Sequence, residues 1–255
     1  MRVWPIFKKE MRLYFTSPIA WVIGAIFLLI AGYFFSAIFN FFAQASMQSA
    51  MNPQMAREMN PTESVLRPLL SNVTVILLLL MPMVTMRLFA EERRSGTIEL
   101  LLTYPVRDGA VLVGKYLAAL ALYGLMLVGT LLYPLMIAYF ARLDWGAVLT
   151  GYIGLVLLGA TFIAVGLFAS SLTENQIVAS IISFGVLLML WVVGWSADYV
   201  GGAWGKVLSD LSIIEHFDNF AKGVLDTKDV VYYLGFVTLA LFLSLRSLEA
   251  RRWKE

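Results

Sequence analysis

Six long stretches of the sequence are apolar and contain no Asp, Glu, Lys or Arg. They are residues 19–42, 69–86, 116–140, 145–170, 177–197 and 230–245. An α-helix needs about 20 such residues to cross the hydrocarbon of a bilayer. A lone helix satisfies its own backbone in lipid, whereas a lone strand does not. The sequence therefore predicts an all-α integral membrane protein with six transmembrane helices, in which residues 1–255 form a single transmembrane domain.

The composition supports this class and argues against others. Hydrophobic residues make up 60% of the chain and charged residues 14%, whereas soluble proteins have about 45–50% apolar and about 25% charged residues. The net charge of +2 provides no concentrated basic surface, so we expect no nucleic-acid partner. The chain has no cysteine, which excludes disulfides, thiol catalysis and thiolate metal sites.

The distribution of Lys and Arg predicts the sidedness of the chain. Thirteen of the 19 basic residues lie in the segments on the same side as both termini, and six lie on the other side. Basic residues favour the cytoplasmic side of a membrane. We therefore expect both the N-terminus and the C-terminus to be cytoplasmic.

Residues 1–17 precede the first span and have an amphipathic pattern. In a helix their aromatic and Met side chains lie on one side and their cations on the other; these are Trp4, Phe7, Met11, Tyr14 and Phe15, opposite Lys8, Lys9 and Arg12. This pattern predicts a helix in the cytoplasmic interface, with cations facing anionic lipid. The alternative is a basic flank that only sets the topology.

The cytoplasmic segment 91–115 contains the pattern of a short helix. Thr97 suits the N-cap of this helix, Glu99 its positive end, and Pro105 its termination. Leu101 and Leu102 then share an apolar face with Ile98. A short apolar face outside the lipid needs a partner, which is either the chain's own spans or a separate cytoplasmic protein.

Residues 109–115 of this segment resemble a phosphate-binding loop only superficially. That loop needs Ser or Thr after its Lys and a strand before it, but Tyr116 follows Lys115. The favoured interpretation is structural: Asp108 caps the third span, and Lys115 extends to the membrane interface at its entrance.

The outer segment 198–229 contains a capping box at Ser212 and Glu215. The apolar side chains after it fall on one face of a helix, the polar ones fall on the other, and Gly223 is a natural stop; they are Ile213, Phe217, Phe220 and Val224, opposite Glu215, Asp218 and Lys222. We expect an amphipathic helix on the outer membrane surface, or a partly re-entrant one.

Two residue patterns resemble metal-binding sites, and a structural interpretation is favoured for both. His216 lies next to Glu215 and near Asp218, but adjacent and i+2 side chains diverge around a helix. A polar interfacial histidine is therefore preferred. Four methionines at intervals of four suggest a soft-metal site but are more typical of packing; they are Met47, Met51, Met55 and Met59. We predict no catalytic, metal or cofactor site in this chain.

Segment 91–115 resembles the cytoplasmic loop of type-two ABC exporter permeases. The resemblance lies in the acidic start, Gly-Thr-x-Glu, a Leu run, a Pro and a later Gly-Lys; these are Glu91, Glu92, Gly96, Thr97, Glu99, Leu101, Leu102, Pro105, Gly114 and Lys115. The Lys8-Lys9-Glu10 and Ser17-Pro18 motifs and residues 170–175 are also similar to that family. Residues 211–229 resemble its gliding-motility-associated branch.

The resemblance implies the permease subunit of an ABC exporter, with no enzymatic activity of its own. Two copies of a separate ATPase subunit would bind ATP and Mg, and a second permease subunit, identical or homologous, would complete the path among membrane lipids. It also implies a multi-pass protein of a bacterial or archaeal cytoplasmic (inner) membrane. The expected ATPase-coupling residues are Glu91, Glu92, Gly96, Thr97, Glu99, Leu101, Leu102, Pro105 and Glu174.

Two other functions remain open at the level of sequence. One is a non-transporting membrane scaffold or force-transmitting subunit of an ATPase complex. The other is an ion-coupled secondary carrier, although the spans contain no internal acid or base of the kind that such carriers usually need. Small residues at four-residue spacing predict close helix contacts within or between chains; the pairs are Gly32/Ser36, Ala160/Ala164 and Gly166/Ser170.

Overall fold

The computed structural model describes residues 3–49, 60–97 and 107–252. These residues are mostly helical, and they contain no strand. The elements are α1 (Val3–Thr16), α2 (Pro18–Ser49), η1 (Thr62–Leu66), α4 (Arg67–Thr85), α5 (Arg87–Arg94), α7 (Asp108–Thr130), α8 (Leu132–Phe140), α9 (Trp145–Leu172), α10 (Gln176–Val200), α11 (Gly202–Leu211), α12 (Ile213–Ala221) and α13 (Thr227–Arg252).

Six helical stretches are long and apolar enough to cross a membrane. They are Pro18–Gln48, Thr62–Arg94, Asp108–Phe140, Trp145–Leu172, Gln176–Ser196 and Thr227–Ala250. The prediction of an all-α chain with six candidate spans is thus confirmed for the described residues. Most of the helices extend beyond the predicted apolar stretches, because polar residues continue a helix after the hydrophobic pattern has ended.

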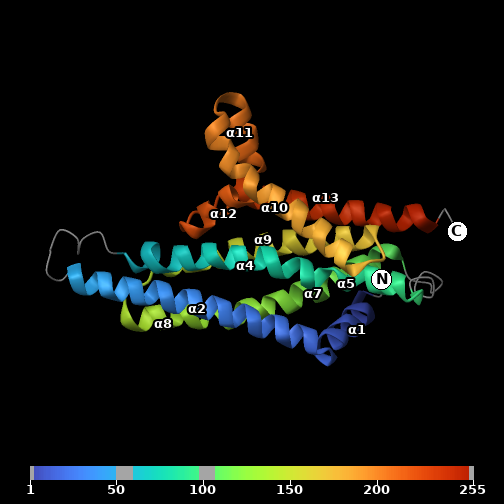
Figure 1. The fold of residues 1–255 in the computed structure, drawn as a ribbon, viewed down its shortest axis with the longest axis horizontal. Helices are drawn as coiled ribbons and strands as arrows, with labels where there is room; N and C mark the ends of the chain where they lie inside the picture. Colours follow the sequence, from blue (N-terminus) through green and yellow to red (C-terminus); the bar gives the residue numbers. More distant parts are fainter. Residues whose placement is uncertain (1–2, 50–59, 98–106, 253–255) are drawn as a thin grey trace.

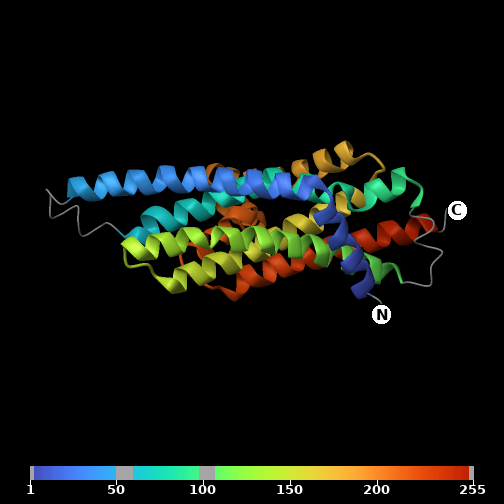
Figure 2. The ribbon, with the colours of Figure 1, turned by 90° about the horizontal axis from the view of Figure 1, so that it is seen from below.

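The spans form an elongated bundle with α9 at its centre (Figures 1 and 2). The apolar window of α9 is 78% buried and that of α4 is 72% buried, against 22% for α2 and α10 and 17% for α13. The core of the bundle is therefore built around α4, α7 and α9. The exposed apolar sides of α2, α10 and α13 face outward, as expected for contact with lipid or with another membrane subunit.

Two spans are interrupted, and each interruption has a proline nearby. The second span breaks at Met86 between α4 and α5, four residues after Pro82. The third breaks at Leu131 between α7 and α8, three residues before Pro134. Pro134 lacks the N–H that would bond to the Thr130 carbonyl, which accounts for the second break. Pro82 precedes the first break, where the Met86 N–H still donates to the Pro82 carbonyl at 2.9 Å.

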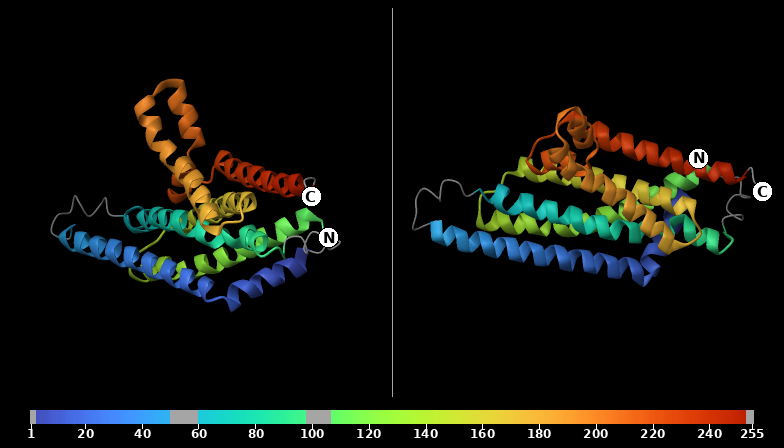
Figure 3. Two further views of the ribbon diagram at one scale, coloured as in Figure 1. Left: turned by 45° about the vertical axis from the view of Figure 1, so that its right-hand side comes forward. Right: turned by 45° about the horizontal axis from the view of Figure 1, so that its top comes forward.

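Helix α10 diverges from the bundle, and α11 turns back beside it to form a projecting hairpin (Figures 1 and 3). The turn between them contains Gly201 and Gly202, both with φ of 61°, a backbone conformation that favours glycine. Helix α12 then returns to the bundle and packs against α9.

The start of α1, the end of α5, the start of α7 and the end of α13 lie at one end of the bundle (Figures 1 and 2). Helix α1 crosses α7 at this end and packs against it. An even number of spans places the two ends of the chain together in this way. Their location in the cytoplasm stays a prediction from the Lys and Arg distribution.

Candidate functional site

A buried cluster of ion pairs joins three helices at the end of the bundle where α1, α5 and α7 meet. The Nζ atom of Lys115 on α7 lies 2.9 Å from Oε1 of Glu10 on α1 and 3.0 Å from Oε1 of Glu92 on α5. Lys9 of α1 also pairs with Glu92, at 3.0 Å. Lys115 is 1% exposed and Glu10 is 6% exposed. Each buried charge therefore has an opposite charge in direct contact, which offsets the cost of its desolvation.

Gly114 allows α1 to approach α7 closely enough for these pairs to form. A Cβ atom at position 114 would lie 2.8 Å from Cγ2 of Ile6 and 3.3 Å from the carbonyl oxygen of Val3. A larger side chain would therefore push α1 away from α7. The Gly114-Lys115 motif thus combines a close helix contact with the charge that fixes it.

The predicted roles of Asp108 and Lys115 were wrong. Lys115 does not extend to the interface, because it is enclosed by the two carboxylates. Arg107, rather than Asp108, occupies the N-cap of α7. Residues 109–115 belong to the regular helix α7 and form no phosphate-binding loop.

The end of α5 positions four of the predicted coupling residues. Glu91 is exposed on α5, and Glu92 points into the ion-pair cluster. Ser95 ends the helix, and Gly96 follows it with φ of 68°, the left-handed conformation that often terminates helices. The Thr97 hydroxyl donates to the carbonyl of Glu92 at 3.3 Å. The chain is therefore turned sharply just before the predicted short helix.

The remaining coupling residues differ in what the structure shows. Glu174 is exposed in the turn between α9 and α10, and both of these helices contact α5. The turn therefore lies at the same end as residues 91–97. Four predicted residues lie outside the described residues, together with the proposed short helix; they are Glu99, Leu101, Leu102 and Pro105.

Ser170 of α9 forms hydrogen bonds with the backbone at the break between α4 and α5. Its hydroxyl accepts hydrogen bonds from the backbone N–H of Phe89 at 2.9 Å and Ala90 at 3.1 Å, and donates to the carbonyl of Met86 at 2.9 Å. These groups lie at the start of α5, where a new helix leaves N–H groups without partners of its own. Four residues earlier on α9, a Cβ at Gly166 would lie 2.0 Å from Oγ1 of Thr85. The predicted small-residue pair Gly166/Ser170 therefore makes its close contacts within the chain.

Residues 3–16 form the predicted helix α1, but its burial differs from a simple interfacial helix. Tyr14 and Glu10 are buried against the bundle. Trp4 remains 70% exposed and Phe15 38% exposed. The polar residue Glu10 thus lies on the packed side of the helix. The position of α1 in the membrane interface stays a prediction.

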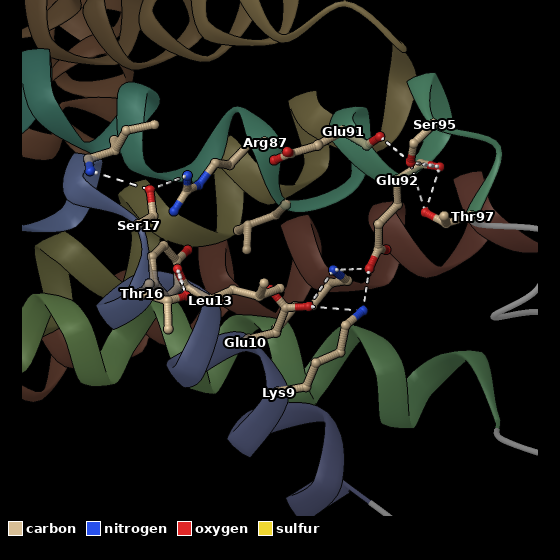
Figure 4. A pocket seen from close by; sticks show the side chains of 14 residues that line it. Lys9, Glu10, Leu13, Thr16, Ser17, Arg87, Glu91, Glu92, Ser95 and Thr97 are labelled. Atoms are coloured by element: carbon tan, nitrogen blue, oxygen red, sulfur yellow. Dashed lines mark hydrogen bonds and ion pairs between the residues drawn. The ribbon is translucent and has the colours of Figure 1, made fainter.

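A cavity of ≈ 490 Å³ lies beside the ion-pair cluster. It is bounded by α1, the start of α2 and α5, and Lys115 reaches it from α7. Figure 4 shows Arg87 beside Ser17 at one end of the cavity, Glu92 beside Lys9 at the other, and Glu91 between them.

At the other end of the bundle, the predicted amphipathic helix is α12. The hydroxyl of Ser212 accepts from the backbone N–H of Glu215 at 3.4 Å. The Glu215 carboxylate accepts from the Ser209 hydroxyl. The apolar face of the helix is buried, with the exception of Val224, which lies beyond the end of α12 and is 53% exposed; the buried members are Ile213, Phe217 and Phe220. Because α12 packs on α9, this face belongs to the core of the protein.

His216 is buried, so the prediction of a polar interfacial histidine was wrong. It is 4% exposed, and its ring stacks on Tyr232 with 3.9 Å between the centroids. Its Nδ1 pairs with Oδ1 of Asp229 at 2.5 Å, and Asn219 donates to Oδ2 of the same carboxylate at 2.9 Å. This network fastens α12 to the start of α13. Within the described residues, no group of three or more His, Cys, Asp or Glu side chains is arranged to hold a metal ion.

One comparison with known proteins finds a match over nearly the whole chain. A family model described as "ABC-2 family transporter protein" matches residues 4–248. No curated protein matches the chain.

Proposed function

The chain belongs to the ABC-2 transporter family, and on this premise we propose that it is the permease subunit of an ATP-binding cassette exporter. Two copies of a separate ATPase subunit would bind ATP and Mg, and a second permease subunit, identical or homologous, would complete the transport path. The complex would reside in the cytoplasmic membrane of a bacterium or archaeon. The more specific resemblance to the gliding-motility-associated branch stays a prediction from residues 211–229.

The observation that carries this proposal is that the two helices flanking the predicted coupling segment, α5 and α7, meet in the ion-pair cluster at one end of the bundle. The segment 98–106 is bounded by α5 on one side and by α7 on the other. Lys115 and Glu92 join these two helices directly, and Glu10 adds α1. A force applied to the segment would therefore act on three helices that are held together by buried charges.

The hydrogen bonds of Ser170 extend this connection to the centre of the subunit. They join the start of α5 to α9, which packs against α4, α10, α12 and α13. We infer that α5 transmits movement of the ATPase subunit to the spans through this joint. Coupling through packed elements of this kind requires an arrangement with two discrete states.

The proposal is tested by disrupting the predicted apolar face of the coupling segment. In a complex purified with its ATPase subunit, the pair Leu101→Asp/Leu102→Asp should remove the stimulation of ATP hydrolysis by the permease or weaken co-purification. The matched control is Val224→Asp/Leu225→Asp, because these two adjacent residues are each 53% exposed and lie at the other end of the bundle. Equal effects of the two pairs would contradict the proposal.

The scaffold alternative is separated from transport by a vesicle experiment. An exporter should move a lipid, peptide or glycan across reconstituted vesicles in an ATP-dependent manner. A scaffold or force-transmitting subunit would support ATP hydrolysis with no such movement. An ion-coupled carrier would instead keep its transport activity without ATP and lose it when the ion gradient is dissipated.

A further inference from the structure

The cavity beside the ion-pair cluster has the size and lining of a ligand site. Its ≈ 490 Å³ lies within the range of about 300–1,000 Å³ that is typical of small-molecule pockets. Its lining includes Ser17, which lies between α1 and α2. Leu13 and Ile19 line it and are 49% and 44% exposed, so an apolar part of a ligand would leave the cavity beside them.

Two residues that line this cavity, Tyr14 and Glu92, each have a buried polar atom with no hydrogen-bond partner among the described residues. These atoms are the hydroxyl of Tyr14, a residue that is only 3% exposed, and Oε2 of Glu92. Burial raises the pKa of Tyr14 well above its usual value and the nearby Glu10 raises it further, while Arg87 lowers it by less. Its hydroxyl therefore remains a neutral donor. Buried polar groups in proteins normally have a partner, so these two atoms indicate where a ligand would bind.

Two charged groups of the lining are also left without an opposite charge. Lys115, Lys9, Glu10 and Glu92 neutralise one another in the cluster. Among the described residues, no carboxylate lies within 4.0 Å of the Arg87 guanidinium, which contacts only the Ser17 hydroxyl at 3.4 Å and the ring of Tyr14. The exposed carboxylate of Glu91 likewise has no Lys or Arg within this distance in the described part of the chain.

We propose that this cavity binds the phosphoethanolamine headgroup of a phospholipid. The phosphate would accept hydrogen bonds from Arg87, Tyr14 and Ser17. The ammonium would donate to Glu91 and to Oε2 of Glu92. The carboxylates of Glu91 and Glu92 would repel a simple anion, and Arg87 would repel a simple cation. A zwitterion with N–H donors places its negative group beside Arg87 and its positive group beside the carboxylates. The exposed Leu13 and Ile19 favour a headgroup that carries acyl chains over a soluble aminophosphate.

Native mass spectrometry of the full chain in detergent tests the proposal. The probes are phosphatidylethanolamine, phosphatidylcholine and phosphatidylglycerol with identical acyl chains. We expect one phosphatidylethanolamine site with an affinity at least about tenfold higher than for the other two lipids, because only this lipid forms charge-assisted hydrogen bonds at both ends. Free phosphoethanolamine should compete only weakly. Equal binding of all three lipids, or equally strong binding of free phosphoethanolamine, would overturn it.

Single substitutions locate the site and separate its two halves. Arg87→Gln should weaken phosphatidylethanolamine binding about tenfold or more. Arg12→Gln is the matched control, because Arg12 is an exposed cation of the same interfacial region and does not line the cavity. Glu91→Gln should instead remove the preference for phosphatidylethanolamine over phosphatidylglycerol while phosphate binding persists. An equal loss with Arg12→Gln would show non-specific lipid binding and overturn the assignment. A thermal melt of each variant confirms that it is folded.

Discussion

Lys115 and Glu10 lie 105 residues apart in the sequence and form a buried ion pair, with 2.9 Å between Nζ and Oε1. The pair fixes the N-terminal helix α1 on the third span. It also places Glu92, at the end of the second span, in the same cluster. The two helices that flank the proposed coupling segment are thus joined by charge on the inside of the protein.

The first prediction concerns this cluster. Lys115→Met should lower the free energy of unfolding by about 3–5 kcal/mol, because it leaves the buried Glu10 with only the more distant Lys9, at 3.9 Å, as an opposite charge. Denaturant unfolding in mixed micelles measures the loss. Lys8→Met, which removes an exposed cation of α1, should have little effect. Adding Glu10→Gln to Lys115→Met should restore part of the stability, and no recovery would argue against the pair.

The second prediction concerns the contact between α1 and α7. Gly114→Ala should destabilise the protein by about 1–3 kcal/mol, because the new Cβ would lie 2.8 Å from the Ile6 side chain. In the same helix, Gly124→Ala meets no atom within 4 Å and should be neutral or stabilising. Combining Gly114→Ala with Ile6→Ala should relieve part of the clash. Equal thermal stability of the two glycine variants would contradict the close packing of α1.

The third prediction concerns the joint at the start of α5. Ser170→Ala should cost about 1–3 kcal/mol of stability, because two buried N–H groups lose their acceptor. The adjacent Ser171 is also buried, but among the described residues its hydroxyl bonds only to the Phe168 carbonyl within the same helix. Ser171→Ala should therefore have a smaller effect on the unfolding midpoint. The reverse order would show that Ser170 does not hold the joint.

The fourth prediction concerns the opposite end of the bundle. Asp229→Asn should lower the free energy of unfolding by about 1.5–3 kcal/mol, since it removes the charge that holds His216. The control Asp226→Asn removes an exposed carboxylate three residues earlier, and its amide oxygen keeps the cap at the start of α13. Hydrogen exchange of α12 should increase in the first variant alone. Unchanged protection of α12 would count against this fastening.

The spans were predictable because membrane hydrocarbon requires long apolar stretches, and each predicted stretch coincides with an observed helical stretch. The helix ends were not predictable in the same way. Asp108 to Lys115, for example, continue the third helix although they include charges. Hydropathy reports where a helix meets lipid, whereas backbone hydrogen bonding and capping decide where the helix ends.

The candidate site was only partly predictable. The motif around Glu92 and Gly96 was visible, but its connection to Glu10 was not, because sequence spacing does not show which distant helices meet. A signal was present, since Glu10 is the only acidic residue before Glu58 and Lys115 is the only Lys or Arg between Arg107 and Arg142. Isolated charges of this kind are expensive to bury unless they are paired.

Site-specific cross-linking most directly tests whether an ATPase subunit drives this permease from the end with the ion-pair cluster. The chain has no cysteine, so Thr97→Cys and Tyr199→Cys each introduce a single attachment point for a photo-cross-linker. Both residues are exposed; Thr97 follows α5, and Tyr199 lies near the end of α10 in the projecting hairpin. In a complex purified with its ATPase subunit, we expect cross-links to that subunit from position 97, altered by ATP, and none from position 199. Cross-links from position 199 alone, or from neither position in an intact complex, would contradict the account.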